Sequence, residues 1–160
     1  MKYRLINFLF CFFLIIFLGS CTIQGPTLER ILIMSEMPDA ACVLKVLEPF
    51  SEAQKVLQQH LEGKEYSQED KLVLVSIERF FLYPERDKRW FSVDLYQDDS
   101  KLIKISLVRR LPEKPDKDDL VQARALMDQV QKAVIVQCSK STNVTSTKEI
   151  SKLIDPEIMK

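Results

Sequence analysis

Three consecutive runs with the composition of β-strands, between residues 71 and 109, constrain the fold more than any other feature. Residues 71–83 are rich in β-branched and aromatic side chains, and residues 89–97 and 101–109 alternate apolar with polar positions. The connector Asp98-Asp99-Ser100 joins the last two runs and has the composition of a tight turn. We therefore expect a three-stranded antiparallel meander.

Helical patterns flank these three runs. One helix is predicted from Asp39 to Glu48 and a second from Ser51 to Gly63, each beginning at a residue suited to an N-cap. A longer amphipathic helix is predicted to run to Cys138, because its apolar positions recur every three or four residues. These positions are Leu120, Ala123, Met127, Val130 and Val134. The expected fold class is α+β: two N-terminal helices, a three-stranded antiparallel meander and a long C-terminal helix packed on the sheet.

Pairing the apolar residues of the meander divides it into two faces. We expect Leu95 opposite Ile103 and Phe81 opposite Phe91, which leaves Arg79 as a charged residue on the apolar face. The other face then carries a row of charged residues and, at one end, an apolar patch. The charged row is Glu78, Asp94 and Lys104, and the patch is Phe80, Leu82, Trp90 and Val108. The patch is a candidate partner surface, and burial of Trp90 in the core is the alternative.

The first 21 residues have the organisation of an export signal. Lys2 and Arg4 precede an unbroken apolar run over residues 8–18, which is short for a membrane span. The run leads into Leu18-Gly19-Ser20-Cys21. This segment resembles the lipobox of bacterial lipoproteins, which implies that Cys21 receives acyl chains such as palmitate and becomes the mature N-terminus. The alternative is an uncleaved membrane anchor over residues 6–23.

The resemblance also implies an address outside the cytoplasm. An acylated Cys21 would anchor the chain to a membrane on the extracytoplasmic side of the cell envelope. Thr22 follows the lipidated position, whereas lipoproteins kept at the inner membrane of enteric bacteria usually carry Asp there. The resemblance therefore favours the periplasmic face of the outer membrane if the cell is Gram-negative.

The cysteines of the mature chain form one candidate cross-link. Cys11 would leave with the signal peptide and Cys21 would carry lipid, which leaves Cys42 and Cys138. In an oxidising compartment such a pair predicts a disulfide, here between the first and the last helix. Two buried free thiols are the alternative.

These features divide the chain into four parts. The resemblance implies that residues 1–20 are a lipoprotein signal peptide, and we expect residues 21–36 to be the lipidated N-terminus and a tether, in which residues 31–34 have the composition of a short edge strand. Residues 37–138 form a single α+β domain of a size that can bury its own core. Residues 139–160 are rich in Ser, Thr and Lys and are expected to form a flexible polar tail.

Composition argues against several kinds of chemistry. The chain has 23 basic and 23 acidic residues, so its net charge gives no general attraction to nucleic acid. His60 is the single histidine, which leaves no ligand set for a zinc ion. Only Gly25 and Gly63 follow the signal peptide, too few for a phosphate or dinucleotide loop. We expect no cofactor, no metal and no nucleic-acid partner.

The favoured function is that of a membrane-tethered, non-enzymatic binding or assembly module of the bacterial cell envelope, which holds an envelope protein at the apolar patch. One alternative is an envelope hydrolase that acts on peptidoglycan or glycan through the paired carboxylates of Glu78 and Asp94. Another is a carrier that encloses an apolar ligand between the helices and the sheet. An exposed apolar patch would favour the binding module, converging carboxylates would favour the hydrolase, and a closed dry cavity would favour the carrier.

The lipobox makes a prediction about acylation. Changing Cys21→Ser removes the thiol that would carry the lipid, so a fatty-acid probe fed to the producing cells should label the unaltered chain and not the variant. The control variant Cys11→Ser should keep its label, because Cys11 lies within the signal peptide. Acyl labelling that persists in Cys21→Ser would contradict the lipoprotein assignment.

Overall fold

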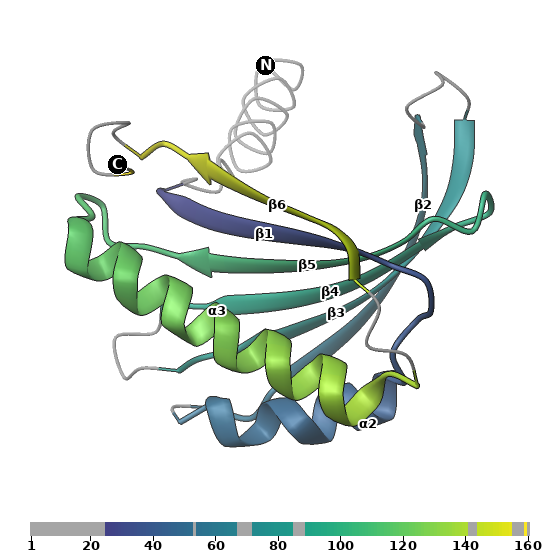
Figure 1. Cartoon of the computed structure of the whole chain (residues 1–160), viewed down its shortest axis with the longest axis horizontal. Helices are drawn as coiled ribbons and strands as arrows, with labels where there is room; N and C mark the ends of the chain where they lie inside the picture. The colour runs from purple at the N-terminus through teal and green to yellow at the C-terminus, as the bar shows by residue number, and fades with distance from the viewer. Residues whose placement is uncertain are drawn as a thin grey trace, which may run out of the picture.

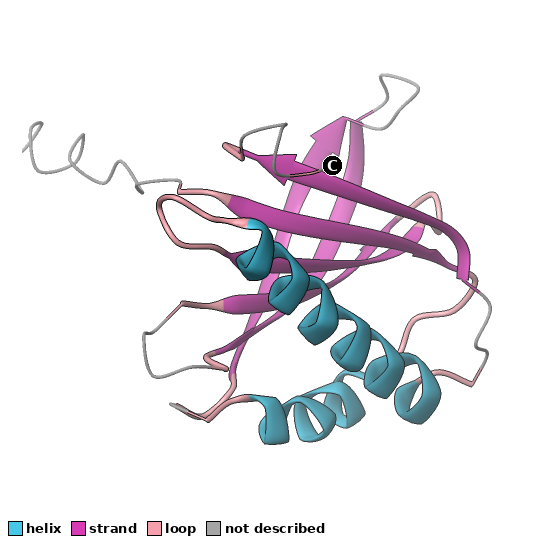
Figure 2. Ribbon diagram, turned by 60° about the vertical axis from the view of Figure 1, so that its left-hand side comes forward, coloured by secondary structure: helices cyan, strands magenta, loops and turns pink. Residues whose placement is uncertain are grey.

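The computed structural model describes residues 25–52, 54–66, 72–84, 89–140 and 144–154, together with Met159; the predicted signal peptide and Cys21 lie outside these residues. Within them, six strands form one antiparallel sheet in the order β2-β3-β4-β5-β1-β6 (Figure 1). The strands are β1 (Thr27–Met34), β2 (Leu57–Tyr66), β3 (Leu72–Leu82), β4 (Phe91–Asp98), β5 (Ile103–Arg110) and β6 (Val144–Lys152). The helices are α2 (Ala40–Leu47), followed by the 3-10 turn η1 (Glu48–Phe50), and α3 (Lys117–Cys138). Both helices lie on the same side of the sheet (Figure 2).

This architecture corrects the expected fold class of two N-terminal helices, a three-stranded meander and a C-terminal helix. The three predicted strands form as β3, β4 and β5, and the first and last predicted helices form as α2 and α3. Residues 51–63 were predicted as a helix, but residues 57–63 belong to β2, so the described residues contain one α-helix before the meander. The expected tether contributes β1 and the expected tail contributes β6; together with β2 they raise the number of strands from three to six.

Pairing with β3 explains why residues 57–66 form a strand. Leu57 and Leu61 are four positions apart, a spacing that suits one face of a helix and equally one face of a strand. In the sheet they pair with Phe81 and Ile77 of β3. Backbone pairing along the whole length of β2 outweighs the small difference in intrinsic propensity between helix and strand.

β1 lies inside the sheet, where it pairs with β5 on one side and with β6 on the other. Arg30 of β1 helps to hold this arrangement. Its guanidinium donates to the side chains of Asp128 and Gln131 on α3. It also donates to Glu149 of β6, at 3.3 Å. One side chain therefore joins two strands and a helix, and the polar composition of β6 does not keep it out of the sheet.

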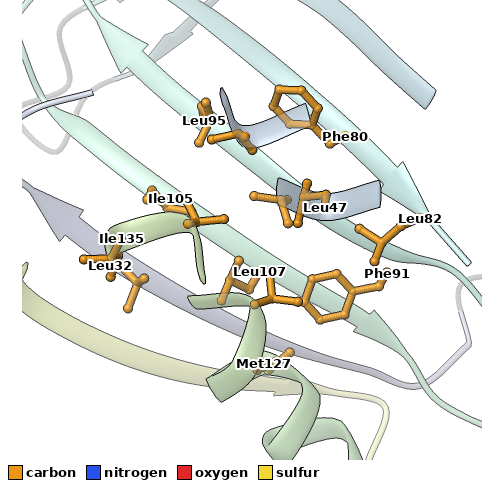
Figure 3. Close-up of a cluster of buried hydrophobic side chains, with 14 of the residues drawn as sticks. Leu32, Leu47, Phe80, Leu82, Phe91, Leu95, Ile105, Leu107, Met127 and Ile135 are labelled. Atoms are coloured by element: carbon orange, nitrogen blue, oxygen red, sulfur yellow. The ribbon is translucent and has the colours of Figure 1, made fainter. Parts of the chain in front are cut away.

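The core lies between the sheet and the two helices (Figure 3). It contains fully buried side chains from α2, α3 and four strands. Among them are Leu32, Leu47, Phe80, Leu82, Phe91, Leu95, Ile105, Leu107 and Met127. Burial of one such side chain contributes about 1.5–3 kcal/mol.

The register of the sheet differs from the predicted one. Leu95 of β4 pairs with Ile105 of β5, two positions from its predicted partner, and a shift of two leaves the faces unchanged. Phe81 of β3 pairs with Ser92 of β4, one position from its predicted partner. A shift of one exchanges the two faces of a strand relative to its neighbour.

That exchange moves four neighbouring side chains of β3. Phe80 and Leu82, predicted on the charged face, are fully buried in the core. Arg79 and Phe81, predicted on the core side, lie on the face that turns away from the helices. The shift therefore moves Arg79 to the open side of the sheet and places Glu78 on the same face as Phe80.

The helices begin at side-chain caps. Asp39, the predicted cap of the first helix, accepts a hydrogen bond from the backbone nitrogen of Cys42 at 2.7 Å. Asp116 and Asp119 form a reciprocal capping box at the start of α3. Within the described residues, no helix combines the length and the apolar character needed to cross a membrane.

Cys42 and Cys138 link α2 to the end of α3. Their sulfur atoms are at disulfide distance, their Cα atoms are 5.5 Å apart and 96 residues separate them in sequence. The backbone nitrogen of Asp39 also donates to the carbonyl oxygen of Cys138 at 3.1 Å. The predicted pair is thus placed where a disulfide joins the first helix to the last.

The cross-link makes a prediction about stability. In the chain-entropy model a loop of this length contributes about 4–5 kcal/mol, so reduction should lower the melting temperature of the domain by on the order of 15 °C. The double variant Cys42→Ser with Cys138→Ser should melt at the lower temperature with or without reductant. Equal melting temperatures for the unaltered protein in oxidising and reducing buffer would contradict this.

Candidate functional site

The face of the sheet that turns away from α2 and α3, here called the open face, carries a groove with a volume of about 1140 Å³. Four neighbouring strands, β3, β4, β5 and β1, supply most of its lining, and the end of β6 completes it. Side chains alternate between the two faces along each strand, so the residues that line the groove are those between the core positions. The groove is thus a direct consequence of the observed register.

Polar side chains form the floor of the groove. Ser92, Asp94 and Ser106 are buried although they lie on the open face. The hydroxyl of Ser106 donates to Glu29 of β1 at 2.7 Å. A buried polar floor that already has hydrogen-bond partners is rigid, and it can present further acceptor atoms to a bound molecule.

Arg79 and Asp94 form an ion pair across β3 and β4. Nε of Arg79 is 3.0 Å from each carboxylate oxygen of Asp94, and Nη2 is 2.6 Å from Oδ2. The side chains are 33% and 11% exposed, respectively. The hydrogen bond to Asp94 raises the pKa of Arg79 above its ordinary value. Arg79 therefore stays charged, and both carboxylate oxygens of Asp94 accept hydrogen bonds from it.

Two aromatic rings of the groove lie next to the Arg79–Asp94 ion pair. The guanidinium of Arg79 lies 5.8 Å from the ring centroid of Phe81. Phe81 in turn meets Trp90 edge to face, with centroids 6.1 Å apart and an interplanar angle of 87°. Phe81, Trp90 and Val108 are half-buried. We call Asp94, Arg79, Phe81 and Trp90 the ion–aromatic cluster; it combines a fixed charge pair with partly exposed aromatic surface.

The remaining lining residues make the groove basic. Its charged side chains are four basic and two acidic, which gives a net charge of +2. Lys152 of β6 contacts Glu29, with Nζ 3.5 Å from Oε2. Arg110 packs so closely over Gly25 that a Cβ there would lie 2.3 Å from Nη2. A larger residue at Gly25 would therefore require the guanidinium of Arg110 to move.

The structure divides the predicted partner patch between two faces. Phe80 and Leu82 are in the core, whereas Trp90 and Val108 line the groove. The one-residue shift between β3 and β4 is the reason, since it replaces Phe80 by Phe81 on the face of Trp90. The patch as predicted is therefore wrong in half of its members.

The predicted pair of carboxylates is not formed. Glu78 pairs with Leu95 and lies on the face opposite Asp94. Asp94 is bound by Arg79, and Lys104 lies over the ring of Tyr96, with Nζ 3.6 Å from the centroid. The row of Glu78, Asp94 and Lys104 therefore does not exist, and the two carboxylates cannot act on one glycosidic bond.

Glu78 belongs to a different cluster, between β2 and β3. It accepts hydrogen bonds from Gln58 at 3.0 Å and from Nδ1 of His60 at 2.5 Å. Nε2 of His60 is 3.2 Å from Glu62. Hydrogen bonds to Glu62 and Glu78 raise the pKa of His60 above 6.5, and that with Gln58 lowers the pKa of Glu78.

Sequence reasoning missed both clusters for identifiable reasons. The helix predicted over 51–63 hid the alternation of Gln58, His60 and Glu62, which places them on one face of a strand. The signal for the ion–aromatic cluster was Arg79, a charge left on the apolar face by the predicted register. Shifting β3 by one residue brings it opposite Asp94.

No group of three or more His, Cys, Asp or Glu side chains in the described part of the chain could hold a metal ion. Comparison with known proteins adds no relative: no family model, no curated protein and no solved structure matches the chain.

The cluster around His60 makes a prediction about pH. His60 is the single histidine, so one imidazole resonance reports its titration, and its pKa should lie above 6.5. Glu62→Gln should lower that pKa most and Glu78→Gln somewhat less. Because the folded-state pKa is raised, the stabilising contribution is complete below pH 6.5 and is lost as pH rises through the pKa of the folded protein.

Glu65→Gln is the matched control for this titration. Glu65 is on the same strand but on the opposite face, so its change should leave the pKa of His60 in place. A pKa at or below 6.5 in the unaltered chain, or one insensitive to Glu62→Gln, would disprove the assignment.

Proposed function

We propose that this chain is a membrane-tethered, non-enzymatic binding module of the bacterial cell envelope, and that the groove holds a protein partner. The observation that carries the proposal is the ion–aromatic cluster on a sheet face that the helices leave uncovered. Tryptophan and arginine are enriched among the residues that dominate binding energy. Trp90 and Arg79 are held in place by Phe81 and Asp94, so little entropy is lost when a partner orders them.

The lipobox supports the address. Acylation at Cys21 would anchor the chain on the extracytoplasmic side, and Thr22 favours the periplasmic face of the outer membrane in a Gram-negative cell. Cys21 precedes Gly25, which lines the groove, by four residues. An extended segment of that length spans at most about 14 Å. The groove would therefore lie near the membrane surface, within reach of proteins embedded in it.

The charge of the groove indicates the chemistry of the partner. With a net charge of +2 among its lining residues, the groove favours a segment that carries acidic side chains. The buried polar floor suits backbone groups, and the half-buried rings of Phe81 and Trp90 suit an apolar side chain. An acidic segment with at least one large apolar residue fits all three features.

The competing functions lose their support. A hydrolase that uses Glu78 and Asp94 is not proposed, because these carboxylates lie on opposite faces of the sheet. A carrier of an apolar ligand requires an enclosed apolar cavity. The groove instead lies on an outer face of the sheet and has six charged side chains in its lining, which favours a macromolecular partner.

The groove makes a prediction about partner capture. Trp90→Ala and Phe81→Ala each remove one half of the aromatic pair, which should cost about 1–2 kcal/mol of stability. Each should weaken capture of the native partner at least tenfold, on the order of a hot-spot loss. The measurement is photo-cross-linking of the lipidated chain in its own membranes, followed by identification of the captured protein.

Val121→Ala is the matched control. Val121 is an exposed apolar residue on α3, 62% accessible and remote from the groove. It should change neither stability nor capture. Folded Trp90→Ala and Phe81→Ala variants that capture the same proteins as the unaltered chain would refute the groove as the partner site.

A further inference from the structure

β2 is an open edge of the sheet. It is ten residues long, it pairs with β3 on one side, and no described strand pairs with its other side (Figure 1). All of its described side chains, residues 57–65, are exposed. It contains no proline and one lysine, Lys64. A long exposed edge with so little protection offers its unpaired backbone groups to another strand.

Exposed apolar residues gather at this edge. Seven large apolar side chains are exposed in the described residues, and four of them belong to β2 and β3. These are Leu57, Leu61, Leu72 and Leu74, between 39% and 58% accessible. Apolar exposure concentrated beside an open edge is typical of a contact surface rather than of a solvated one.

The opposite edge of the sheet, β6, differs in both respects. It has lysines at 148 and 152, and none of the exposed large apolar residues lies on it. Its Glu149 is bound by Arg30 and Arg124. Lysines on an edge oppose strand addition. An occupant is therefore expected at β2.

We propose that β2 pairs antiparallel with β2 of a second copy of this chain, about a two-fold axis at Leu61. Such a pair joins the two sheets edge to edge, with each strand presenting the same surface to the other. The groove takes no part in it, because no residue of β2 lines the groove.

The choice of register follows from side-chain alternation and charge. Two antiparallel registers use almost the whole of β2 and keep opposed side chains on the same face of the joined sheet, one centred on Leu61 and one on Glu62. Centring on Glu62 would oppose two Glu62 side chains and would place His60 opposite Lys64. The first contact brings like charges together at any pH near neutral, and the second does so when His60 is protonated, so this register is unfavourable.

Centring on Leu61 gives complementary contacts instead. His60 then lies opposite Glu62 of the second copy, and by symmetry Glu62 lies opposite His60 of the second copy. Leu61 meets its own counterpart, and Lys64 meets Gln58. The apolar centre with an opposite-charge pair on each side makes this strand self-complementary.

A cysteine cross-link tests the register. In the full-length chain purified in detergent, Leu61→Cys places two thiols directly opposite each other, at a separation compatible with a disulfide. Leu57→Cys is the control, since its thiols would be about 27 Å apart in the same dimer. We expect oxidised dimers for Leu61→Cys, and no more than the background of the unaltered chain for Leu57→Cys.

A charge reversal tests the interface independently. Glu62→Lys opposes two positive groups on each side of the axis and should weaken self-association on the order of tenfold, as measured by sedimentation. Glu65→Lys changes the net charge equally but faces Leu57 of the second copy, and should leave the association nearly unchanged. These readouts do not depend on the groove or on the lipid anchor.

Three results would overturn the proposal. The first is an unaltered chain that sediments as a monomer at every concentration. The second is a Leu57→Cys variant that cross-links as well as Leu61→Cys. The third is a Leu61→Cys variant that, when oxidised in its native membranes, links only to a different protein, which would assign the β2 edge to strand addition by a partner.

Discussion

Arg79 and Asp94 face each other across β3 and β4, and this pairing fixes which side chains of β3 share a face with those of β4. With this register Phe80 and Leu82 enter the core beside the apolar residues of β4. A slip of one residue would turn Arg79 towards the helices, away from its carboxylate, and would expose Phe80. A buried cation without a partner costs several kcal/mol. The ion pair thus stabilises the observed register, and loss of the pair destabilises the register shifted by one residue.

Contacts between residues that are far apart in sequence hold the N-terminal and C-terminal parts of the domain together. β1 pairs with β5 and β6, Arg30 reaches α3, and the link between Cys42 and Cys138 spans 96 residues. These contacts join segments that are far apart in sequence, so their loop-closure entropy is large and the covalent link offsets part of it. The same contacts hold β1 in the sheet directly after Gly25, so that Gly25 and Thr27 line the groove.

The periodicity of apolar residues and the helix caps predicted those helices and strands whose formation depends mainly on neighbouring residues in the sequence. β3, β4, β5, α2 and α3 have clear periodicity or caps, and they form where the patterns place them. β2 was not predictable in this way, because the spacing of Leu57 and Leu61 fits a helix and a strand alike. β6 has the composition of a solvated tail and becomes a strand through tertiary contacts such as that of Glu149. Of the groove residues, Trp90 and Val108 belong to the patch predicted from the sequence, whereas Phe81 and Arg79 could be placed there only with the observed register.

The strand order separates the two surfaces proposed for binding. β2 lies at one edge of the sheet and β1 near the other, with β3, β4 and β5 between them. At about 4.8 Å per strand, the two are separated by roughly 19 Å. The groove begins at β3, next to β2, but no residue of β2 lines it, and its end beside Gly25 is the part farthest from the β2 edge. A dimer of this kind would present two grooves from one membrane-bound unit. The second groove would then meet its partner at a raised effective concentration, so modest affinity at each groove would suffice for stable capture of an oligomeric partner.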